Sequence, residues 1–129
     1  MYAIQNDILW QSIKTNDWKN VEFYPTPNKK GGMEPTSIVV RHVDTVLGAQ
    51  ALAQYIQKPD VALSGHINID SQGNVTQNVE FTVEVDGSAI FINLCDRQFG
   101  QVPVLQEVLE VIQSKYMIKD IITHSDRRI

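Results

Sequence analysis

Ser37-Ile-Val-Val-Arg-His-Val43 is the stretch that decides the fold class of this chain. Its β-branched side chains follow one another with little interruption, which is typical of a short strand in a sheet covered on both faces. Alternating or apolar runs predict three more strands, at residues 65–70, 88–94 and 120–124. The sequence therefore predicts a central sheet.

Two helices are predicted between these strands. Residues 48–57 place four small or aliphatic side chains on one face, and Pro59 ends that helix. Residues 104–116 carry the stronger pattern, an apolar stripe of leucine, valine, isoleucine and tyrosine with glutamates outside it. Because helices interrupt the strands, we expect the α/β class: a single domain with a mixed central β-sheet flanked by helices.

Two turn signals suggest how neighbouring strands pair. Ser71-Gln-Gly-Asn74 predicts a turn after which the chain pairs back from Val75. Asp86-Gly87 is a two-residue hairpin signal, so we expect residues 79–85 to pair with residues 88–94.

The N-terminal part of the 129-residue chain is less regular. Residues 1–24 are weakly helical at first and then strand-like, and residues 25–35 have the turn chemistry of a loop. We therefore expect residues 1–36 to form an N-terminal extension and loop, and residues 37–126 to form the core of one domain.

Composition excludes several functional classes. A net charge of -4 and a pI of about 5.2 give no field that would draw the chain to a nucleic acid polymer or an anionic membrane. No run approaches the 18 apolar residues of a membrane span, and the N-terminus has neither a basic nor an apolar signal region, so we expect a cytoplasmic protein. The single cysteine, Cys95, excludes an intramolecular disulfide. Association into a homo-oligomer is compatible with this composition.

Histidines lie at three places in the predicted fold: His42, His66 and His124. Neutral imidazoles delivered from strand ends are what a catalytic zinc uses, together with a third protein ligand and an open position for water. His42 and His124 are the candidate metal pair, with Asp44 or Asp126 as nearby stand-ins for the third ligand. The alternative is two histidines satisfied by hydrogen bonds, and for His66 we favour such a structural role, with a ring nitrogen bonded to the backbone.

Several short motifs follow one another in a fixed order. A strand ends in a histidine, a helix and a proline follow, and then come a Ser-x-His strand, an Asp-x-x-Gly turn, a buried strand, an amphipathic helix with a tyrosine, and a final His-Ser-Asp. In this chain they are His42-Val-Asp-Thr45, Pro59, Ser64-Gly-His66, Asp70-Ser-Gln-Gly73, Ile92-Asn-Leu94, Tyr116 and Ile122-Thr-His-Ser-Asp126. In this order the chain resembles the zinc-dependent N-acetylmuramoyl-L-alanine amidases, the family of amidase-type phage lysozymes and peptidoglycan-recognition proteins.

The resemblance implies an amidase-like core at residues 37–126 and a zinc site, but the chain departs from the family's pattern. The third ligand, an Asp or Cys, lies about eight to ten residues beyond the last ligand histidine in the family, and we expect it to be missing here. The family's general base falls at Asn93, which cannot accept a proton at neutral pH. Gly65 stands where some members have a tyrosine. A shift of one residue would place Arg41 at the first ligand position, but we prefer His42 because its spacing to His66 then needs no gap.

These departures favour a degenerate member of the family, with no cofactor and with zinc as the only candidate. If the groove binds a ligand, the resemblance places six residues at it: Arg41, His42, His66, Asn93, His124 and Arg127. Arg97, Arg128, Lys29 and Lys30 are further cations that would suit an anionic ligand, although surface solvation is the alternative for each. Cys95 is more simply a buried small hydrophobic residue than a ligand or nucleophile.

Three functions are compatible with this sequence. The first is a protein that binds or sequesters a small polar or anionic ligand, a cell-wall fragment or a signalling nucleotide, in the former active-site groove. The second is a working zinc-dependent amidase that hydrolyses peptidoglycan with His42 and His124 as ligands. The third is a structural or interaction module of a phage, made in a bacterial host. We favour the first, because the third ligand and the base are both expected to be missing.

Overall fold

The computed structural model describes residues 1–14, 17–95 and 102–128, and for residues 13, 14, 102 and 124–128 the backbone alone. The central sheet has six strands in the order β4-β7-β6-β8-β5-β9. Only the β6–β7 pair is antiparallel; the other neighbours run parallel. The strands are β4 (Glu22–Phe23), β5 (Ser37–Asp44), β6 (Ile67–Ile69), β7 (Val75–Gln77), β8 (Ala89–Leu94) and β9 (Asp120–Arg128). The predicted mixed sheet is confirmed, with all four predicted strands in it.

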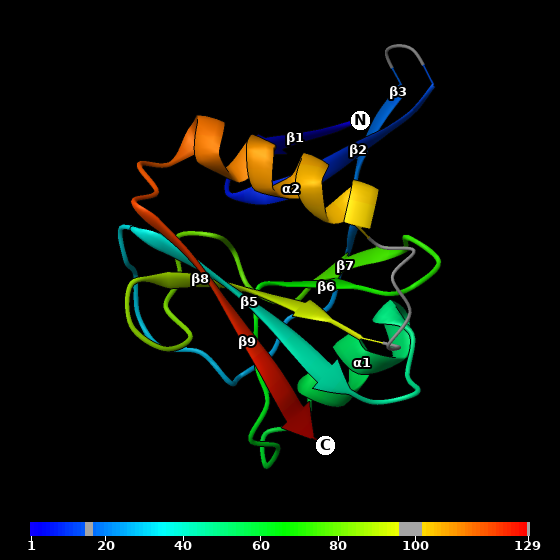
Figure 1. Ribbon diagram of the computed structural model, residues 1–129, viewed down its shortest axis with the longest axis vertical. Helices are drawn as coiled ribbons and strands as arrows, with labels where there is room; N and C mark the ends of the chain where they lie inside the picture. The colour runs from blue at the N-terminus through cyan, green and yellow to red at the C-terminus, as the bar shows by residue number, and fades with distance from the viewer. Residues whose placement is uncertain (15–16, 96–101, 129) are drawn as a thin grey trace.

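Two helices cover the two faces of this sheet (Figure 1). Helix α2 (Val102–Lys115) packs through Val108 and Ile112 on an aliphatic layer from β5, β6 and β8. Helix α1 (Ala49–Ile56) packs through Leu52 and Ile56 on the opposite face. Strand side chains alternate between faces, so each central strand contributes to both layers. Both predicted helices are confirmed, with ends shifted by one or two residues.

The predicted hairpin at Asp86-Gly87 is wrong. Strand β8 lies between β6 and β5 and pairs in parallel with both, so neither of its edges is free for the segment that precedes it. Residues 79–88 instead form a loop that contacts the 30–33 segment through backbone hydrogen bonds and an isolated bridge between Gly32 and Val83. Asp86-Gly87 does form a turn, in which Gly87 has a φ of 68°, but the turn does not join paired strands. The turn at Asp70–Asn74 does, because β7 pairs back on β6 as expected.

The first part of the chain forms a second, three-stranded antiparallel sheet rather than the expected weak helix. It consists of β1 (Tyr2–Gln5), β2 (Ile8–Lys14) and β3 (Asp17–Asn20). Asn6 and Asp7 join β1 to β2 with φ values of 55° and 62°, the conformation of a two-residue hairpin turn. Tight pairing on either side of that turn overrides the local helical preference.

This small sheet is fastened to the main sheet through buried contacts. Leu9 lies in the core under α2, and its N–H donates to Oε1 of the buried Gln77 at 2.8 Å. The hydroxyl of Tyr116 donates to Asp7 Oδ1 at 2.5 Å. Residues 1–36 therefore fold together with the rest of the chain, and β4 completes one edge of the central sheet.

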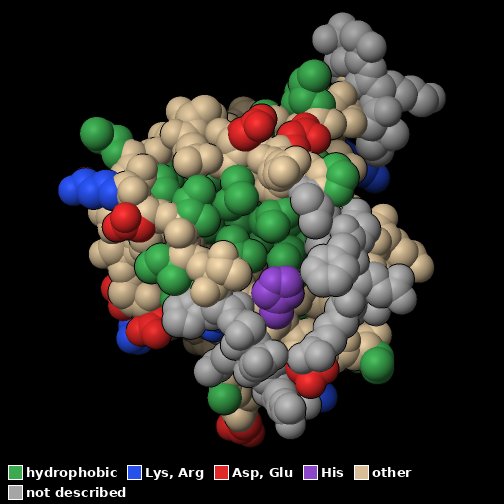
Figure 2. Space-filling model, viewed as in Figure 1, with side chains coloured by type: hydrophobic (Ala, Val, Ile, Leu, Met, Phe, Trp, Pro, Cys, Tyr) green, Lys and Arg blue, Asp and Glu red, His purple; other side chains and the backbone are tan. Residues whose placement is uncertain are grey.

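Hydrophobic side chains gather in the middle of the face shown in Figure 2, below α2. At the β9 edge of the sheet Ile121 and Ile122 are 44% and 43% exposed. Of the helices in the described residues, none is long and apolar enough to cross a bilayer.

Candidate functional site

A row of polar residues crosses the central sheet at one level. Following the pairing from β4 to β9, it consists of Glu22, Thr76, Asn68, Asn93, Arg41 and His124. We call these six residues the polar row. Residues paired across neighbouring strands carry side chains on the same face. For the members of the row whose side chains are described, this is the face covered by α1. The layer on the other face is aliphatic, so the row is the chemically distinctive part of the sheet.

Arg41 is the only cation of this row whose side chain is described, and it is buried. Its Nε donates to Asn93 Oδ1 at 3.2 Å, and its Nη2 donates to the carbonyl of Ser64. The guanidinium carbon lies 4.4 Å from the centre of the Phe91 ring, a cation–π contact. An arginine remains protonated at any physiological pH. The row therefore holds a permanent positive charge in a fixed orientation.

The buried amides beside Arg41 form a connected hydrogen-bond network. Asn93 Nδ2 donates to Asn68 Oδ1 at 3.0 Å, and Asn68 Nδ2 donates to Thr76 Oγ1 at 3.1 Å and to Asn78 Oδ1 at 2.7 Å. Thr76 and Asn78 donate in turn to the carbonyls of Ala49 and Ala53 in α1. Buried amides are costly when unpaired, so each member of this network constrains the next. Arg41 is thus connected to α1 by side-chain contacts.

Gly65 makes room for this arrangement. A Cβ on residue 65 would lie 2.5 Å from Asn93 Nδ2 and 3.3 Å from the Arg41 Nη2. No side chain fits there unless Asn93 and Arg41 move. The observed positions of Arg41 and Asn93 therefore require a glycine at position 65.

The structure corrects the preference for His42 over Arg41. Arg41 pairs with both Asn93 and His124, whereas His42 pairs with Leu94, a member of the aliphatic layer under α2. Strand alternation thus places His42 on the other face from Asn93. The His124 ring and the Arg127 side chain lie outside the described residues, as does Arg97 altogether; in the backbone, Arg127 pairs with Val43.

His66 is held by the backbone through both ring nitrogens. Its Nδ1 accepts the Phe91 N–H at 3.0 Å, so its Nε2 carries the proton that it donates to the Val83 carbonyl at 2.7 Å. Burial lowers the pKa of His66 to about 4, and the charge of Arg41 acts in the same direction, against the hydrogen bond to Val83, which raises it. Neither nitrogen is open to a ligand, which supports the structural interpretation of His66.

A cavity of about 380 Å³ opens beside Arg41, and we call it the Arg41 cavity. Lys29, Lys30, Ser64 and Asp86 also line it. The structure thereby brings together three of the cations that the sequence analysis singled out. Lys30 also forms an ion pair with Glu84 at 3.7 Å. The Lys30 side chain is 61% exposed, so the pair lies at the surface.

Hydrogen bonds from Asn28 and Ser64 hold the loop that carries Lys29 and Lys30 in place. Asn28 Nδ2 donates to the carbonyls of Ile56 and Lys58, each at 2.9 Å. Ser64 Oγ donates to the Asn28 carbonyl at 2.6 Å. The wall of the Arg41 cavity is therefore formed before any ligand arrives, which lowers the entropic cost of binding.

The described residues of this site do not fit zinc. Arg41 holds the strand position that pairs with His124, and a guanidinium has no lone pair to give a metal. Asn93 offers an amide in place of a carboxylate. Among the side chains that the structure describes, no three His, Cys, Asp or Glu gather closely enough to hold a metal ion. Cys95 is buried, within the apolar cluster beside α1.

Known structures share this architecture. A mutant endolysin from Bacillus subtilis superposes with a TM-score of 0.66 at 20% sequence identity, over 81% of this chain and 82% of that one. The catalytic domain of XlyA superposes with a TM-score of 0.63 at 19% identity, over 81% and 84% of the two chains. The fold is amidase-like. The resemblance seen in the motifs is thereby confirmed for the fold, although no family model and no curated protein sequence matches the chain.

Sequence reasoning found Arg41 and Asn93 but missed the rest of the network. Asn68, Thr76 and Asn78 are fully or almost fully buried, and Ser64 supplies a carbonyl to Arg41. One signal was present, since Asn68 and Asn93 each stand between two aliphatic residues in a buried strand. An amide in that setting needs buried partners, and two such amides predict that they are each other's partners.

Proposed function

We propose that this protein binds a small anionic ligand in the Arg41 cavity of an amidase-like fold, and that it does not hydrolyse peptidoglycan. The ligand is a cell-wall fragment with a carboxylate or a signalling nucleotide with a phosphate, and the protein sequesters it. One observation carries this proposal: a fixed, buried guanidinium lies beside Asn93 at the strand position that pairs with His124.

The charge balance of the cavity supports an anion. Arg41, Lys29 and Lys30 contribute three positive charges to the lining, against the Asp86 carboxylate and the Glu84 carboxylate that pairs with Lys30, so one positive charge is in excess. A guanidinium suits carboxylate and phosphate oxygens, and its donors act more strongly where water is partly excluded. The Arg41 cavity also falls within the range of roughly 300–1,000 Å³ that small-molecule sites occupy.

Calorimetric titration with muramyl dipeptide and with a cyclic dinucleotide tests this proposal. We expect one of the two to bind with a dissociation constant in the micromolar range, about 1–100 μM, and to raise the melting temperature. Replacing both lysines by alanine, in Lys29→Ala/Lys30→Ala, should weaken that binding by about tenfold or more while leaving the fold intact.

A matched control separates the cavity from general surface charge. Lys115→Ala/Lys119→Ala removes two exposed lysines near the end of α2 and should leave the affinity unchanged. Equal weakening by both double variants would reduce the effect to nonspecific attraction. Failure of both ligands to bind would contradict the proposal.

The second candidate is a zinc-dependent amidase, which the likeness to an endolysin and to the catalytic domain of XlyA favours. It would need metal ligands other than Arg41 and a base other than Asn93. Metal content after purification in zinc-containing buffer, together with turnover of cell walls, distinguishes the two candidates. A structural module of a phage is the third, and it would bind neither zinc nor the anionic ligands.

A further inference from the structure

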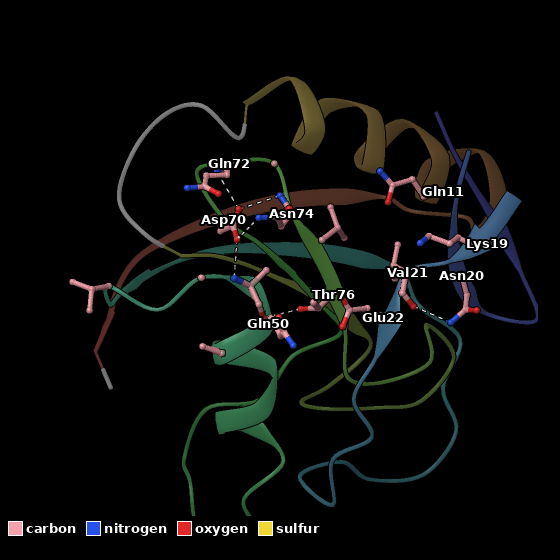
Figure 3. A pocket seen from close by; sticks show the side chains of 16 residues that line it. Gln11, Lys19, Asn20, Val21, Glu22, Gln50, Asp70, Gln72, Asn74 and Thr76 are labelled. Carbon is pink, nitrogen blue, oxygen red and sulfur yellow. Dashed lines mark hydrogen bonds between the residues drawn. The ribbon is translucent and has the colours of Figure 1, made fainter. Parts of the chain in front are cut away.

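A second and larger cavity lies at the other end of the polar row from Arg41. Its volume is about 680 Å³. Thr76, which pairs with Asn68 in the polar row, lies in its lining. It opens between the start of α1, the turn that joins β6 to β7, and strands β2 to β4 (Figure 3). No residue lines both this cavity and the Arg41 cavity, so it is a separate candidate site.

Side-chain carboxamides dominate the polar lining of this cavity, which we call the carboxamide cavity. Gln11 comes from β2, Asn20 from β3, Gln50 from α1, and Gln72 and Asn74 from the β6–β7 turn. Figure 3 shows these side chains placed around the open space from several sides. Each carboxamide carries two N–H donors and one acceptor oxygen. Asn20 and Asn74 each use one donor within the chain, to the Val21 carbonyl at 2.9 Å and to Asp70 Oδ2 at 3.2 Å. The remaining donors and acceptors of the lining can meet a ligand group that both donates and accepts.

The turn that carries two of these amides is held in one conformation. The Asp70 carboxylate accepts the backbone N–H groups of Gln72 and Asn74, each at 3.0 Å, and that of Ala49 at 2.9 Å. Gly73 completes the turn with a φ of 81°, which a side chain would strain. The turn therefore holds the backbone of Gln72 and Asn74 in place before a ligand binds.

The charges of the carboxamide cavity nearly cancel. Lys19 contributes one positive charge and Glu22 one negative charge. The third ionic group, the Asp70 carboxylate, is already engaged by the N–H groups of the turn and of α1. This cavity thus differs from the Arg41 cavity, where cations prevail, and it offers no net attraction to an anion.

We propose that the carboxamide cavity binds a neutral saccharide. Sugar hydroxyls both donate and accept, and they project around a ring in several directions, as the amides do around this cavity. Val46, which is 93% exposed, and the partly buried Val75 add aliphatic surface for the C–H faces of a sugar. A peptide would instead present its donors and acceptors along a line, which amides spread over four elements match less well.

The test uses the full chain labelled with ¹⁵N and two probes, N,N′-diacetylchitobiose and maltotriose. Binding should shift the side-chain NH₂ signals of Gln50, Gln72 and Asn74, with a dissociation constant of about 1 mM or below for at least one probe. The double variant Gln50→Ala/Gln72→Ala should weaken that binding by about tenfold or more.

Gln54→Ala is the matched control, because Gln54 is an exposed glutamine of the same helix that does not line the cavity. It should leave the affinity unchanged. The proposal is overturned if neither saccharide shifts these signals, if the double variant binds as well as the parent, or if an uncharged blocked tripeptide binds and the saccharides do not. Because the probes are neutral and the Arg41 cavity is not used, failure here leaves the proposed anion binding untouched.

Discussion

The two faces of the central sheet are built from the same strands but hold different chemistry. Ile90 and Ile92 of β8 point to an aliphatic layer under α2, while Asn93 of the same strand joins a hydrogen-bonded row on the side of α1. Burial of aliphatic area stabilises the first face. On the second, each polar group depends on a specific partner. One face thus supplies stability, and the other holds the site proposed to bind an anion.

The largest effect should follow from a cavity in the aliphatic face. Ile92 is fully buried, so Ile92→Ala should lower the free energy of unfolding by about 4 kcal/mol, through lost burial and an unfilled space. Urea denaturation measures this loss. Ile121→Ala is the matched control, since its side chain is 44% exposed, and it should cost less than about 1 kcal/mol. If both variants lost the same free energy of unfolding, Ile92 would not be a core residue.

Acid should weaken the polar face through His66. Burial lowers its folded-state pKa to about 4, below the ordinary 6.5, so the unfolded chain binds the proton first as the pH falls. The stability present above about pH 6.5 should therefore be lost progressively down to about pH 4, by roughly 3 kcal/mol in total.

Unfolding measured across this pH range in the parent and in His66→Gln tests the expectation. The variant should be less stable near neutral pH and should have a flatter profile, because the titrating ring is gone. A profile unchanged by the substitution would assign the acid sensitivity to another group.

A methyl group at Gly65 should disturb the site more than the fold. Its Cβ would lie 2.5 Å from Asn93 Nδ2, so Gly65→Ala should displace Asn93 and Arg41 and cost about 2 kcal/mol. Binding in the Arg41 cavity should weaken with it. Gly31→Ala, where nothing lies within 4 Å, is the control. Unchanged ligand affinity in Gly65→Ala would show that the orientation of Arg41 does not matter.

The smallest effect should come from Thr76, which lies next to the β4 end of the row. Thr76 Oγ1 accepts from Asn68 and donates to the Ala49 carbonyl, and Thr76→Val removes both bonds at nearly constant volume. We expect a loss of about 1–2 kcal/mol in chemical denaturation, because Asn68 Nδ2 keeps its bond to Asn78. A loss as large as that of Ile92→Ala would mean that the row, and not the aliphatic layer, dominates stability.

Much of the fold was predictable, because it rests on local periodicity. The strand around Val39, the helices and the Asp70–Asn74 turn all follow from patterns within one segment. The pairing of β8 could not be predicted, because Asp86-Gly87 has the residues of a hairpin turn. The hairpin is excluded only because β5 and β6 occupy both edges of β8. The N-terminal sheet was missed although Asn6-Asp7 is a turn signal.

The sequence pointed to Arg41 and Asn93 but not to their geometry. Arg41 and His42 are neighbours in sequence, and only the register with β8 and β9 decides which one lies beside Asn93. That register depends on strands some 50 and 80 residues away, which no local spacing encodes. The convergence of Lys29 and Lys30 on Arg41 depends likewise on how the loop is fastened to Ile56 and Ser64.

The central claim is that this amidase-like fold binds through Arg41 and does not hydrolyse peptidoglycan. The most direct measurement is the release of muramyl-linked peptides from purified cell walls by the zinc-supplemented protein, beside an active endolysin as a positive control. We expect no release above the rate without protein, because Arg41 has no lone pair to give a metal and the Asn93 amide cannot act as a base. Zinc-dependent release that disappears in His124→Ala would contradict this account.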